Sequence, residues 1–430
     1  MAMLDPRVVR TLQLGSLVAL LVCSAADVAA QIQPPIRSKV VLVPLDIRVL
    51  DREGNPVRDL TAADFDVYED GVRQEIAHFL PLPLAGETHP GVEVGDEHPL
   101  AGAAATYRTF ILVLGSGQIN VPGKGLDGLV DFVKNRLSPT DRVGVTAYLR
   151  TSEPTTDHTA VLHFLERYRQ DYRALYDRIR WDGRPRNGVL GSVSAETRGR
   201  IDAVFRASGL PVFHGLPGVQ ASRAGHYATH NYVRWTIQHA GRIPGEKHVI
   251  VVAEDRLGVG GLRPASESPN AGLYVKLANE ARVALSYINT GGVPAMGLGR
   301  FMGPIEHGDF FAPTDHRAVT EQTGGIASFY RYASTPLDRI ERGSRFQYLL
   351  GYYPSATHAP DVHRTVRVAV NRRDVTTQYR HGYRLAPSID DEAEFRAAAA
   401  EYRLSTELTR LADNSPDTPL ISSASGGRPR

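Results

Sequence analysis

The sequence predicts an α/β fold in which a doubly wound, mostly parallel sheet is inserted in, or flanked by, a β-sandwich. Between residues 106 and 342, short apolar runs alternate with segments of helical periodicity, as expected for a parallel sheet covered by helices. Residues 38–80 and 343–385 instead show strand alternation and polar turns. Each of these flanking blocks has too few strands to cover an apolar face, so we expect the two blocks to form one sandwich.

The prediction is built around the first strand of the α/β region. An unbroken apolar run over residues 110–114 stops at Gly115, helical spacing follows as far as Ser138-Pro139, and residues 141–149 supply the next strand. A continuous apolar run is typical of a strand that is buried on both faces. Because doubly wound sheets bind ligands beyond the carboxyl ends of their strands, we expect the turn Gly115–Gln118 to carry function.

The remaining elements of the α/β region follow from the same periodicities. Further strands are predicted over residues 248–253, 283–288 and 326–330. Helices are predicted over residues 161–179, 227–240 and 273–281, and from Thr335, which would cap the last helix. Tyr168 and Tyr172 lie on the apolar face of the first of these helices, which favours a role in core packing. Residues 183–217 carry little signal and are expected to form an irregular insertion.

The N-terminal block contains turn signals as well as strands. Residues 43–49 alternate apolar and polar side chains, which predicts a strand with one solvent-facing side. Thr61–Asp64 is typical of a capped helical turn, and Asp70-Gly71 is typical of a tight hairpin turn. A linker rich in Pro and Gly, residues 81–105, leads to the α/β region. After the C-terminal block, residues 386–430 are expected to form a helix and a disordered tail.

Residues 1–30 are typical of a secretory signal peptide. Two arginines form its basic end, residues 12–22 form an apolar stretch too short to span a membrane, and Val28-Ala29-Ala30 resembles a cleavage site. We therefore expect an exported protein, periplasmic or extracellular, with no transmembrane anchor after signal cleavage. The single cysteine, Cys23, lies in this segment, so the mature chain offers no thiolate for zinc or redox chemistry.

The overall charge also limits the choice of partner. The chain has 430 residues, of which 42% are hydrophobic, and its formal net charge is only +2. No cluster of Lys and Arg stands out along the sequence, so the basic footprint of a nucleic-acid-binding protein is missing. We expect no nucleic-acid partner.

Several stretches of the chain carry a resemblance to one family. They are, in order along residues 38–385, DREGNPVRDLTAADFDVYEDGVRQEIAHF, RTFILVL, RVGVTAY, PGEKHVIVVAED, VTEQTGG, RFQYLLGYYPS and RHGYR. Together they resemble exported bacterial proteins, best known from acidobacteria, that contain a von Willebrand factor type A domain. The resemblance implies a binding module with a divalent ion at the top of the sheet. In the family, this ion is held by an Asp-x-Ser-x-Ser motif after the first strand, a Thr from a later loop and an Asp after the fourth strand.

The sequence departs from this metal-binding motif after the first strand. Gly115 takes the place of the Asp, and Gly117 and Ile119 take the places of the two Ser. A shift of the alignment by one residue offers Ser116 and Gln118, which still supply no carboxylate. Because a hard cation needs oxygen ligands that neutralise its charge, we expect no cofactor and no tightly held Mg²⁺, Mn²⁺ or Ca²⁺.

The later acidic position of the motif is matched by Asp255, or by its neighbour Glu254. One carboxylate by itself holds a divalent cation only weakly. Capping of the next turn is an equally good interpretation of these two residues. Asp255 is therefore a weak metal candidate, and any divalent cation bound there would be weakly held.

Enzyme functions are less well supported by the motifs. The stretch GSGQINVPGKG resembles a phosphate-binding loop, but Gln118 and Gly125 occupy the places of the required Gly and Ser/Thr. His226 and His230 are four residues apart on a predicted helix, without a third metal ligand in the pattern. Ser116 lacks the outer Gly of a nucleophile elbow. A secreted hydrolase and a cell-envelope assembly or structural factor are the alternatives to a binding module.

The sequence thus predicts an exported module, without catalytic activity, that binds a protein partner in the cell envelope or outside the cell. Loops at the carboxyl ends of the parallel strands should form its ligand face, and they comprise residues 115–124, 151–157, 254–261 and 290–303. The residues expected at this face are Gly115, Ser116, Gly117, Gln118, Glu254, Asp255 and Arg256. The adjacent charges of residues 254–256 would pair with opposite charges on a protein ligand.

Overall fold

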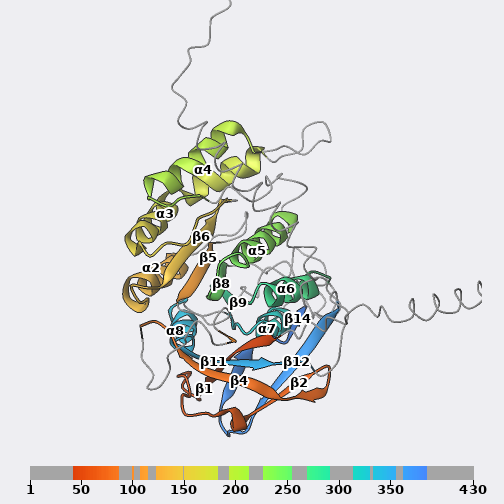
Figure 1. Cartoon of the computed structure of the whole chain (residues 1–430). Helices are drawn as coiled ribbons and strands as arrows, with labels where there is room; N and C mark the ends of the chain where they lie inside the picture. Colours follow the sequence, from red (N-terminus) through yellow and green to blue (C-terminus); the bar gives the residue numbers. More distant parts are fainter. Residues whose placement is uncertain are drawn as a thin grey trace, which may run out of the picture. The chain divides into compact units, whose positions relative to one another are not determined.

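A six-stranded sheet forms the centre of the α/β region in the computed structural model (Figure 1). The structure describes residues 42–86, 99–100, 107–114, 123–148, 150–182, 193–212, 226–253, 269–290, 313–329, 333–354 and 362–384. The strands of the sheet are β5 (Arg108–Leu114), β6 (Arg142–Ala147), β7 (Arg150–Thr151), β8 (Glu246–Ala253), β9 (Val283–Asn289) and β10 (Ala327–Phe329). Their order is β10-β9-β8-β5-β6-β7, and only β7 is antiparallel to its neighbour. The prediction of a mostly parallel sheet is confirmed.

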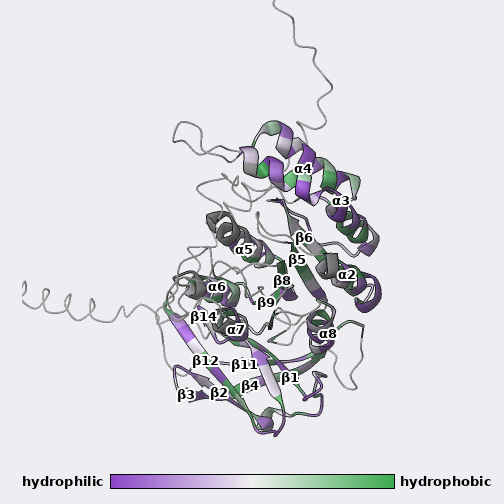
Figure 2. Cartoon of the chain, turned by 180° about the vertical axis from the view of Figure 1, so that it is seen from behind, coloured by the Kyte–Doolittle hydropathy of each residue, from purple (hydrophilic) through white to green (hydrophobic). Residues whose placement is uncertain are grey.

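Helices cover both faces of this sheet. They are α2 (Gly123–Asp131), α3 (His158–Asp182), α4 (Ala195–Ala207), α5 (His226–Ala240), α6 (Pro269–Glu280), α7 (Pro313–Gln322) and α8 (Ser334–Gly343). A π-helix over Phe132–Arg136 continues α2. Figures 1 and 2 show α2, α3 and α8 on one side of the sheet and α5, α6 and α7 on the other. All seven residues of β5 are buried, as its apolar run predicts for a strand covered on both faces. None of the helices in the described ranges is long and apolar enough to cross a membrane.

The two flanking blocks pair with each other in two antiparallel sheets. The N-terminal block contributes β1 (Val43–Leu50), β2 (Phe65–Glu69), β3 (Val72–Gln74) and β4 (Ile76–Pro83). The C-terminal block contributes β11 (Phe346–Tyr352), β12 (His363–Val370), β13 (Thr376–Tyr379) and β14 (Gly382–Arg384). One sheet has the order β13-β1-β11-β4 and the other β14-β12-β2-β3, so each sheet mixes strands from both blocks. The ladders β1–β11, β1–β13, β4–β11 and β2–β12 each join a strand of one block to a strand of the other.

The two antiparallel sheets share one hydrophobic core. Val67 from one sheet and Leu45, Ile47 and Leu350 from the other belong to the same buried cluster. A polar contact crosses this core, because the hydroxyls of Tyr352 and Tyr383 both donate to Glu69 Oε2 at 2.7 Å. Glu69 is thereby satisfied by hydrogen bonds although it is buried.

The turns predicted in the N-terminal block are confirmed. Asp70 and Gly71 connect β2 to β3 with φ of 46° and 84°, the positive values that a two-residue hairpin turn requires. Thr61 precedes a 3₁₀ turn over Ala62–Asp64, and its backbone N–H donates to Asp64 Oδ2 at 2.7 Å. Tyr168 is fully buried in the core of the α/β region, which confirms its predicted packing role.

Two expectations about helices are wrong. Residues 183–217 are not irregular throughout, because α4 lies within them and buries Ile201 and Phe205 against α3. Ser194 caps α4, since its Oγ accepts a hydrogen bond from Thr197 N–H at 3.2 Å. The last helix begins at Ser334, so Thr335 lies inside its first turn and is not the cap.

The amino end of β5 is fixed by a buried ion-pair network. Arg108 is 0% exposed and donates to both carboxylate oxygens of Asp141, at 2.9 and 2.6 Å. The same guanidinium reaches Glu341 Oε1 at 3.2 Å and Ser344 Oγ at 3.0 Å. Charges removed from water in this way are tolerated because their hydrogen-bonding capacity is filled.

Candidate functional site

The residues expected at the ligand face, Gly115, Ser116, Gly117, Gln118, Glu254, Asp255 and Arg256, lie outside the described residues. The structure does describe the strands that precede them in the sequence. β5 ends at Leu114 and β8 at Ala253, and the two strands are parallel neighbours in which Leu114 lies opposite Val252. The strand order reverses between them, because β6 lies on one side of β5 and β8 on the other. Such a switch point is where doubly wound sheets bind ligands.

A group of buried tyrosines supports the carboxyl ends of these strands. Tyr176 donates its hydroxyl to Leu114 O at 3.3 Å. Tyr148 follows β6 with φ of 50°, and its ring centre lies 5.2 Å from that of Tyr168 and 5.1 Å from that of Tyr176. Burial raises the pKa of Tyr176 to about 12 and raises the pKa of Tyr148 further. Both phenols are therefore neutral at physiological pH. Tyr176 acts as a hydrogen-bond donor, whereas Tyr148 acts by packing, because its buried hydroxyl has no hydrogen-bond partner among the described residues.

The expectation that residues 151–157 form a loop at the carboxyl edge is wrong. After β7 the chain runs back along β6, so that Thr155 and Val143 exchange backbone hydrogen bonds of 2.8 and 3.0 Å near the start of β6. This segment is thus removed from the ligand face by local pairing.

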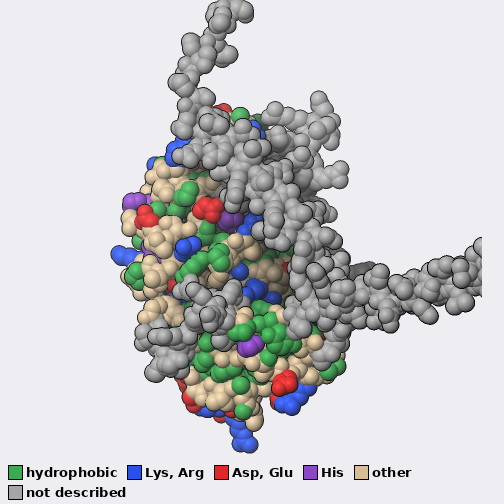
Figure 3. Space-filling view, viewed as in Figure 1, with side chains coloured by type: hydrophobic (Ala, Val, Ile, Leu, Met, Phe, Trp, Pro, Cys, Tyr) green, Lys and Arg blue, Asp and Glu red, His purple; other side chains and the backbone are tan. Residues whose placement is uncertain are grey.

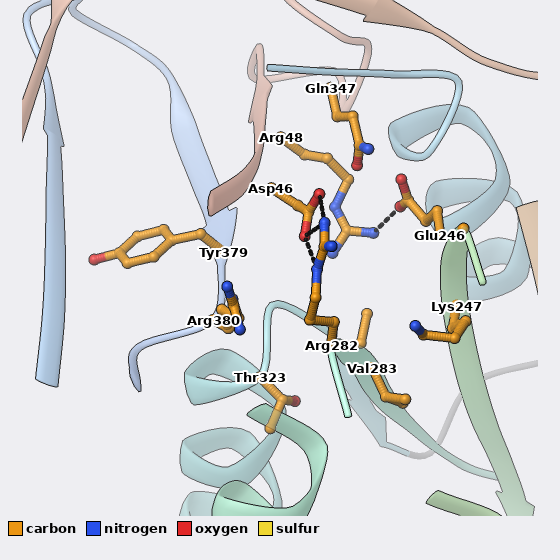
Figure 4. A pocket seen from close by; sticks show the side chains of 12 residues that line it. Asp46, Arg48, Glu246, Lys247, Arg282, Val283, Thr323, Gln347, Tyr379 and Arg380 are labelled. Atoms are coloured by element: carbon orange, nitrogen blue, oxygen red, sulfur yellow. Dashed lines mark hydrogen bonds and ion pairs between the residues drawn. The ribbon is translucent and has the colours of Figure 1, made fainter. Parts of the chain in front are cut away.

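A polar cavity of about 40 Å³ lies at the opposite, amino end of the parallel strands. Its charged lining residues are Asp46, Arg48, Glu246, Lys247, Arg282 and Arg380. Asp46 and Arg48 come from β1 of an antiparallel sheet, and Glu246 and Lys247 begin β8 of the parallel sheet (Figure 4). The cavity is therefore built where the two kinds of sheet meet.

The alternation of side chains along β1 explains why Asp46 and Arg48 line this cavity. Leu45 and Ile47 point into the core of the antiparallel sheets, so the alternating residues Asp46 and Arg48 must point the other way. That polar side of β1 was expected to face solvent, and this expectation is wrong: Arg48 is buried against the parallel sheet. The alternation is correct, but the second face is covered by another part of the chain.

The first ion pair of the cavity involves Glu246. Arg48 Nη1 donates to Glu246 Oε1 at 2.9 Å, and His248 Nε2 lies 2.9 Å from the same oxygen. Burial opposes the ionisation of Glu246, but Arg48 and His248 outweigh it, so the pKa of Glu246 lies below its ordinary value. Burial lowers the pKa of His248 despite the nearby carboxylate, and its Nε2 also lies 3.3 Å from Arg48 Nη1. Arg48 also donates to Gly324 O.

The second ion pair joins Asp46 to Arg282. Arg282 lies in the turn between α6 and β9, with φ of 52°, and donates Nε to Oδ2 at 3.0 Å and Nη2 to Oδ1 at 2.6 Å. Burial opposes the ionisation of Asp46, but Arg282, Arg380 and Lys247 together hold its pKa below the ordinary value. Asp46 is therefore the single carboxylate, among the lining residues, that faces three cations.

Lys247 is the cation of the cavity that has no partner of its own. Lys247 is 6% exposed, and it makes no hydrogen bond or ion pair with the described residues. Figure 4 shows its side chain extending from β8 toward Arg282. Burial, with help from Arg282 and Arg380, lowers the pKa of Lys247 to about 8. The ammonium is thus held in a position that water solvates poorly.

Other polar atoms around the cavity also lack partners within the described ranges. They are Gln347 Nε2, Arg380 Nε and Glu246 Oε2. Gln347 is 1% exposed, and the guanidinium of Arg380 instead donates through its Nη atoms to the backbone oxygens of Pro44 and Asn279. Leaving a buried donor or acceptor unsatisfied costs about 1–3 kcal/mol. The cavity therefore offers unfilled hydrogen-bonding capacity as well as charge.

Sequence reasoning missed this cavity although one local signal was present. Glu246, Lys247 and His248 are charged or polar residues at the start of an otherwise apolar strand. A buried strand does not normally begin with such a group unless its partners are supplied from elsewhere. The partners come from segments about 200 residues away, since Arg48 and Glu246 are 198 positions apart.

Described side chains of both charge signs lie on the one face that Figure 3 shows. On the face shown in Figure 3, acidic and basic side chains are interspersed among the described residues, and basic side chains also lie in a hollow near the middle of the view. Within the described ranges, no group of three His, Cys, Asp or Glu is placed to hold a metal ion. His226 and His230 both belong to α5, but their side chains are not among those described.

A scan against protein-family models gave no match to this chain, and a search of curated proteins found none that matches it significantly.

Proposed function

We propose that this chain is an exported, non-enzymatic binding protein, in which a von Willebrand factor A-like module is carried by a β-sandwich made from both flanking blocks. The strand order β7-β6-β5-β8-β9-β10, with β7 alone antiparallel, supports the doubly wound module. The shared core of the two antiparallel sheets supports the sandwich. Export is proposed from the signal-like residues 1–30.

The functional part of the proposal rests on one observation: β5 and β8 are neighbours and end side by side. Residues 115–118 follow one of these strands and residues 254–256 follow the other, at the switch point of the sheet. A partner docked there would meet glycine-rich backbone from the first segment and the charges of Glu254, Asp255 and Arg256 from the second. Both segments would contribute to one ligand face.

The proposed face binds its partner without a tightly held divalent ion, because Gly115 stands where a carboxylate is needed. A ligand at one hundred times its dissociation constant stabilises a fold by about 2.7 kcal/mol. We therefore expect millimolar Mg²⁺, Mn²⁺ or Ca²⁺ to leave the melting temperature nearly unchanged. A clear rise in melting temperature that disappears in Asp255→Ala would contradict this expectation.

The partner can be sought by crosslinking and pull-down from the cell envelope of the source organism. Once it is captured, the double change Asp255→Ala, Arg256→Ala should weaken binding and leave the melting temperature within a few degrees. The matched control is Asp66→Ala, Arg73→Ala, which removes an exposed acid–arginine pair from β2 and β3. The face is misplaced if only the control loses affinity.

Two outcomes would favour the alternative functions. Turnover on ester, peptide or glycan panels would favour a secreted hydrolase, and retention in an envelope complex without a soluble partner would favour an assembly factor.

A further inference from the structure

We propose that the polar cavity at the amino ends of β8 and β9 binds a hydrogen phosphate ion. This site is distinct from the proposed ligand face, which lies at the other end of the parallel strands. The proposal is independent of the partner-binding function. It rests on the net charge of the cavity, on hydrogen-bond donors that have no acceptor, on the cavity volume, and on one acceptor that has no donor.

Charge is the first argument. Among the lining residues, Arg48 and Glu246 neutralise each other as a close ion pair. Lys247, Arg282 and Arg380 then face the single carboxylate of Asp46, so the described lining residues carry an excess of two positive charges when all are ionised. Concentrated like charge in a poorly solvated place is unfavourable without a counter-ion. A small anion would remove this imbalance.

The unfilled donors are the second argument. The buried atoms Gln347 Nε2, from β11, and Arg380 Nε, from the residue after β13, have no hydrogen-bond partner in the described part of the chain. Lys247, from β8, lines the same cavity and forms no hydrogen bond with the described residues. Charged donors form the stronger hydrogen bonds to anionic oxygens, so two of the three are suited to an oxyanion. Three donors that line one cavity from separate parts of the chain match the several oxygens of a tetrahedral ion better than they match a single-atom anion such as chloride.

The volume of the cavity agrees with an ion of this size. The cavity volume is about 40 Å³. Because roughly 10–15 Å³ on this measure holds a water molecule, the cavity has room for about three waters or one small oxyanion. A nucleotide or a sugar phosphate would not fit in that volume, so the proposal is limited to the inorganic ion.

An unfilled acceptor distinguishes phosphate from sulfate. Glu246 Oε2 is buried without a partner, and the low pKa of Glu246 keeps it ionised. An anion with no proton would leave this oxygen unsatisfied and repel it. Phosphate near neutral pH retains at least one O–H that can donate to Glu246 Oε2, whereas sulfate retains none. The carboxylate would thereby select the protonated ion.

The test is calorimetric titration of the full mature chain with inorganic phosphate at pH 7, with sulfate at equal ionic strength as the competitor. We expect saturable binding of one phosphate per chain and no measurable binding of sulfate. Lys247→Met should weaken phosphate binding by about thirtyfold or more, because it removes one partner of a buried charge pair. Lys276→Met is the matched control, since Lys276 is exposed on α6 outside the cavity, and it should bind phosphate like the wild type.

A second variant tests the selection step. In Glu246→Gln, one oxygen can still accept from Arg48, while the other position becomes an amide donor. We expect this variant to bind sulfate at least as well as phosphate. The proposal is overturned if the wild type binds no phosphate, which would mean that water alone fills the cavity. It is also overturned if wild type binds sulfate and phosphate equally, or if Lys247→Met leaves phosphate affinity unchanged while remaining folded.

Discussion

Replacing Lys247 by methionine should stabilise the protein in phosphate-free buffer. The pKa of Lys247 is lowered from 10.5 to about 8, mainly by burial and then by Arg282 and Arg380. Each tenfold change in proton affinity corresponds to roughly 1.4 kcal/mol, so the charged lysine destabilises the folded state by about 3 kcal/mol. Methionine keeps most of the apolar stem and removes the charge. The free energy of unfolding at pH 7 should therefore rise by about 3 kcal/mol in Lys247→Met.

The gain should depend on pH in a defined direction. Below about pH 8, Lys247 is charged in both the folded and the unfolded chain, so the wild type carries the full penalty. Between about 8 and 10.5, the unfolded chain binds more protons at this residue than the folded chain, so the wild type becomes more stable as the pH rises. Above 10.5 the lysine is neutral in both states. The advantage of the variant should shrink to nearly zero over this window.

Urea unfolding of the wild type and the variant at pH 7, 9 and 10.5 measures this difference directly. Comparing the two proteins at each pH removes the titration of all other groups, which both share. Lys276→Met, which changes an exposed lysine of α6, should differ from the wild type by less than about 0.5 kcal/mol at every pH. A variant that is no more stable than the wild type at pH 7, or a difference that persists at pH 10.5, would refute the reasoning.

Three further predictions concern the fold. Arg108→Met leaves Asp141 buried without its guanidinium partner and should lower the free energy of unfolding by about 3–5 kcal/mol in denaturant titrations; a loss below about 1 kcal/mol would contradict the buried network. Gly325→Ala places a Cβ 2.0 Å from Leu285 O, so a backbone shift is unavoidable, and the melting temperature should fall by several degrees. A chain truncated after Gly343 lacks both neighbours of β1, so residues 43–83 should lose protease resistance; a stable fragment of those residues would show that the block folds alone.

Structural features that depend only on neighbouring residues could be predicted from the sequence. The apolar run of β5, the positive φ angles that Asp70 and Gly71 accept, and the capped turn at Thr61 all depend on residues a few positions apart. No helix was predicted at α4, because its apolar periodicity is weak. The sequence nevertheless contained two indications of this helix: Ser194, which can cap a helix, and the four-residue spacing of Ile201 and Phe205. Element types were therefore predictable, and helix boundaries less so.

Which surfaces are covered was decided by the tertiary structure. Alternation along β1 correctly separated two faces, but only the path of the chain placed Arg48 against Glu246, 198 residues away, and not against water. In the same way, residues 151–157 run back along β6 because Thr155 pairs with Val143. The periodicity of the sequence does not predict this pairing.

The sequence by itself determined the α/β class, the two flanking blocks and the composition of the segments that follow β5 and β8, because these depend on periodicity and residue type. The tertiary structure alone decided that the blocks interleave in two sheets and that Lys247 is buried beside Arg282 and Arg380. The physical reason is that charge interactions depend on distance in space, and residues far apart in the chain are brought together only when the whole chain packs.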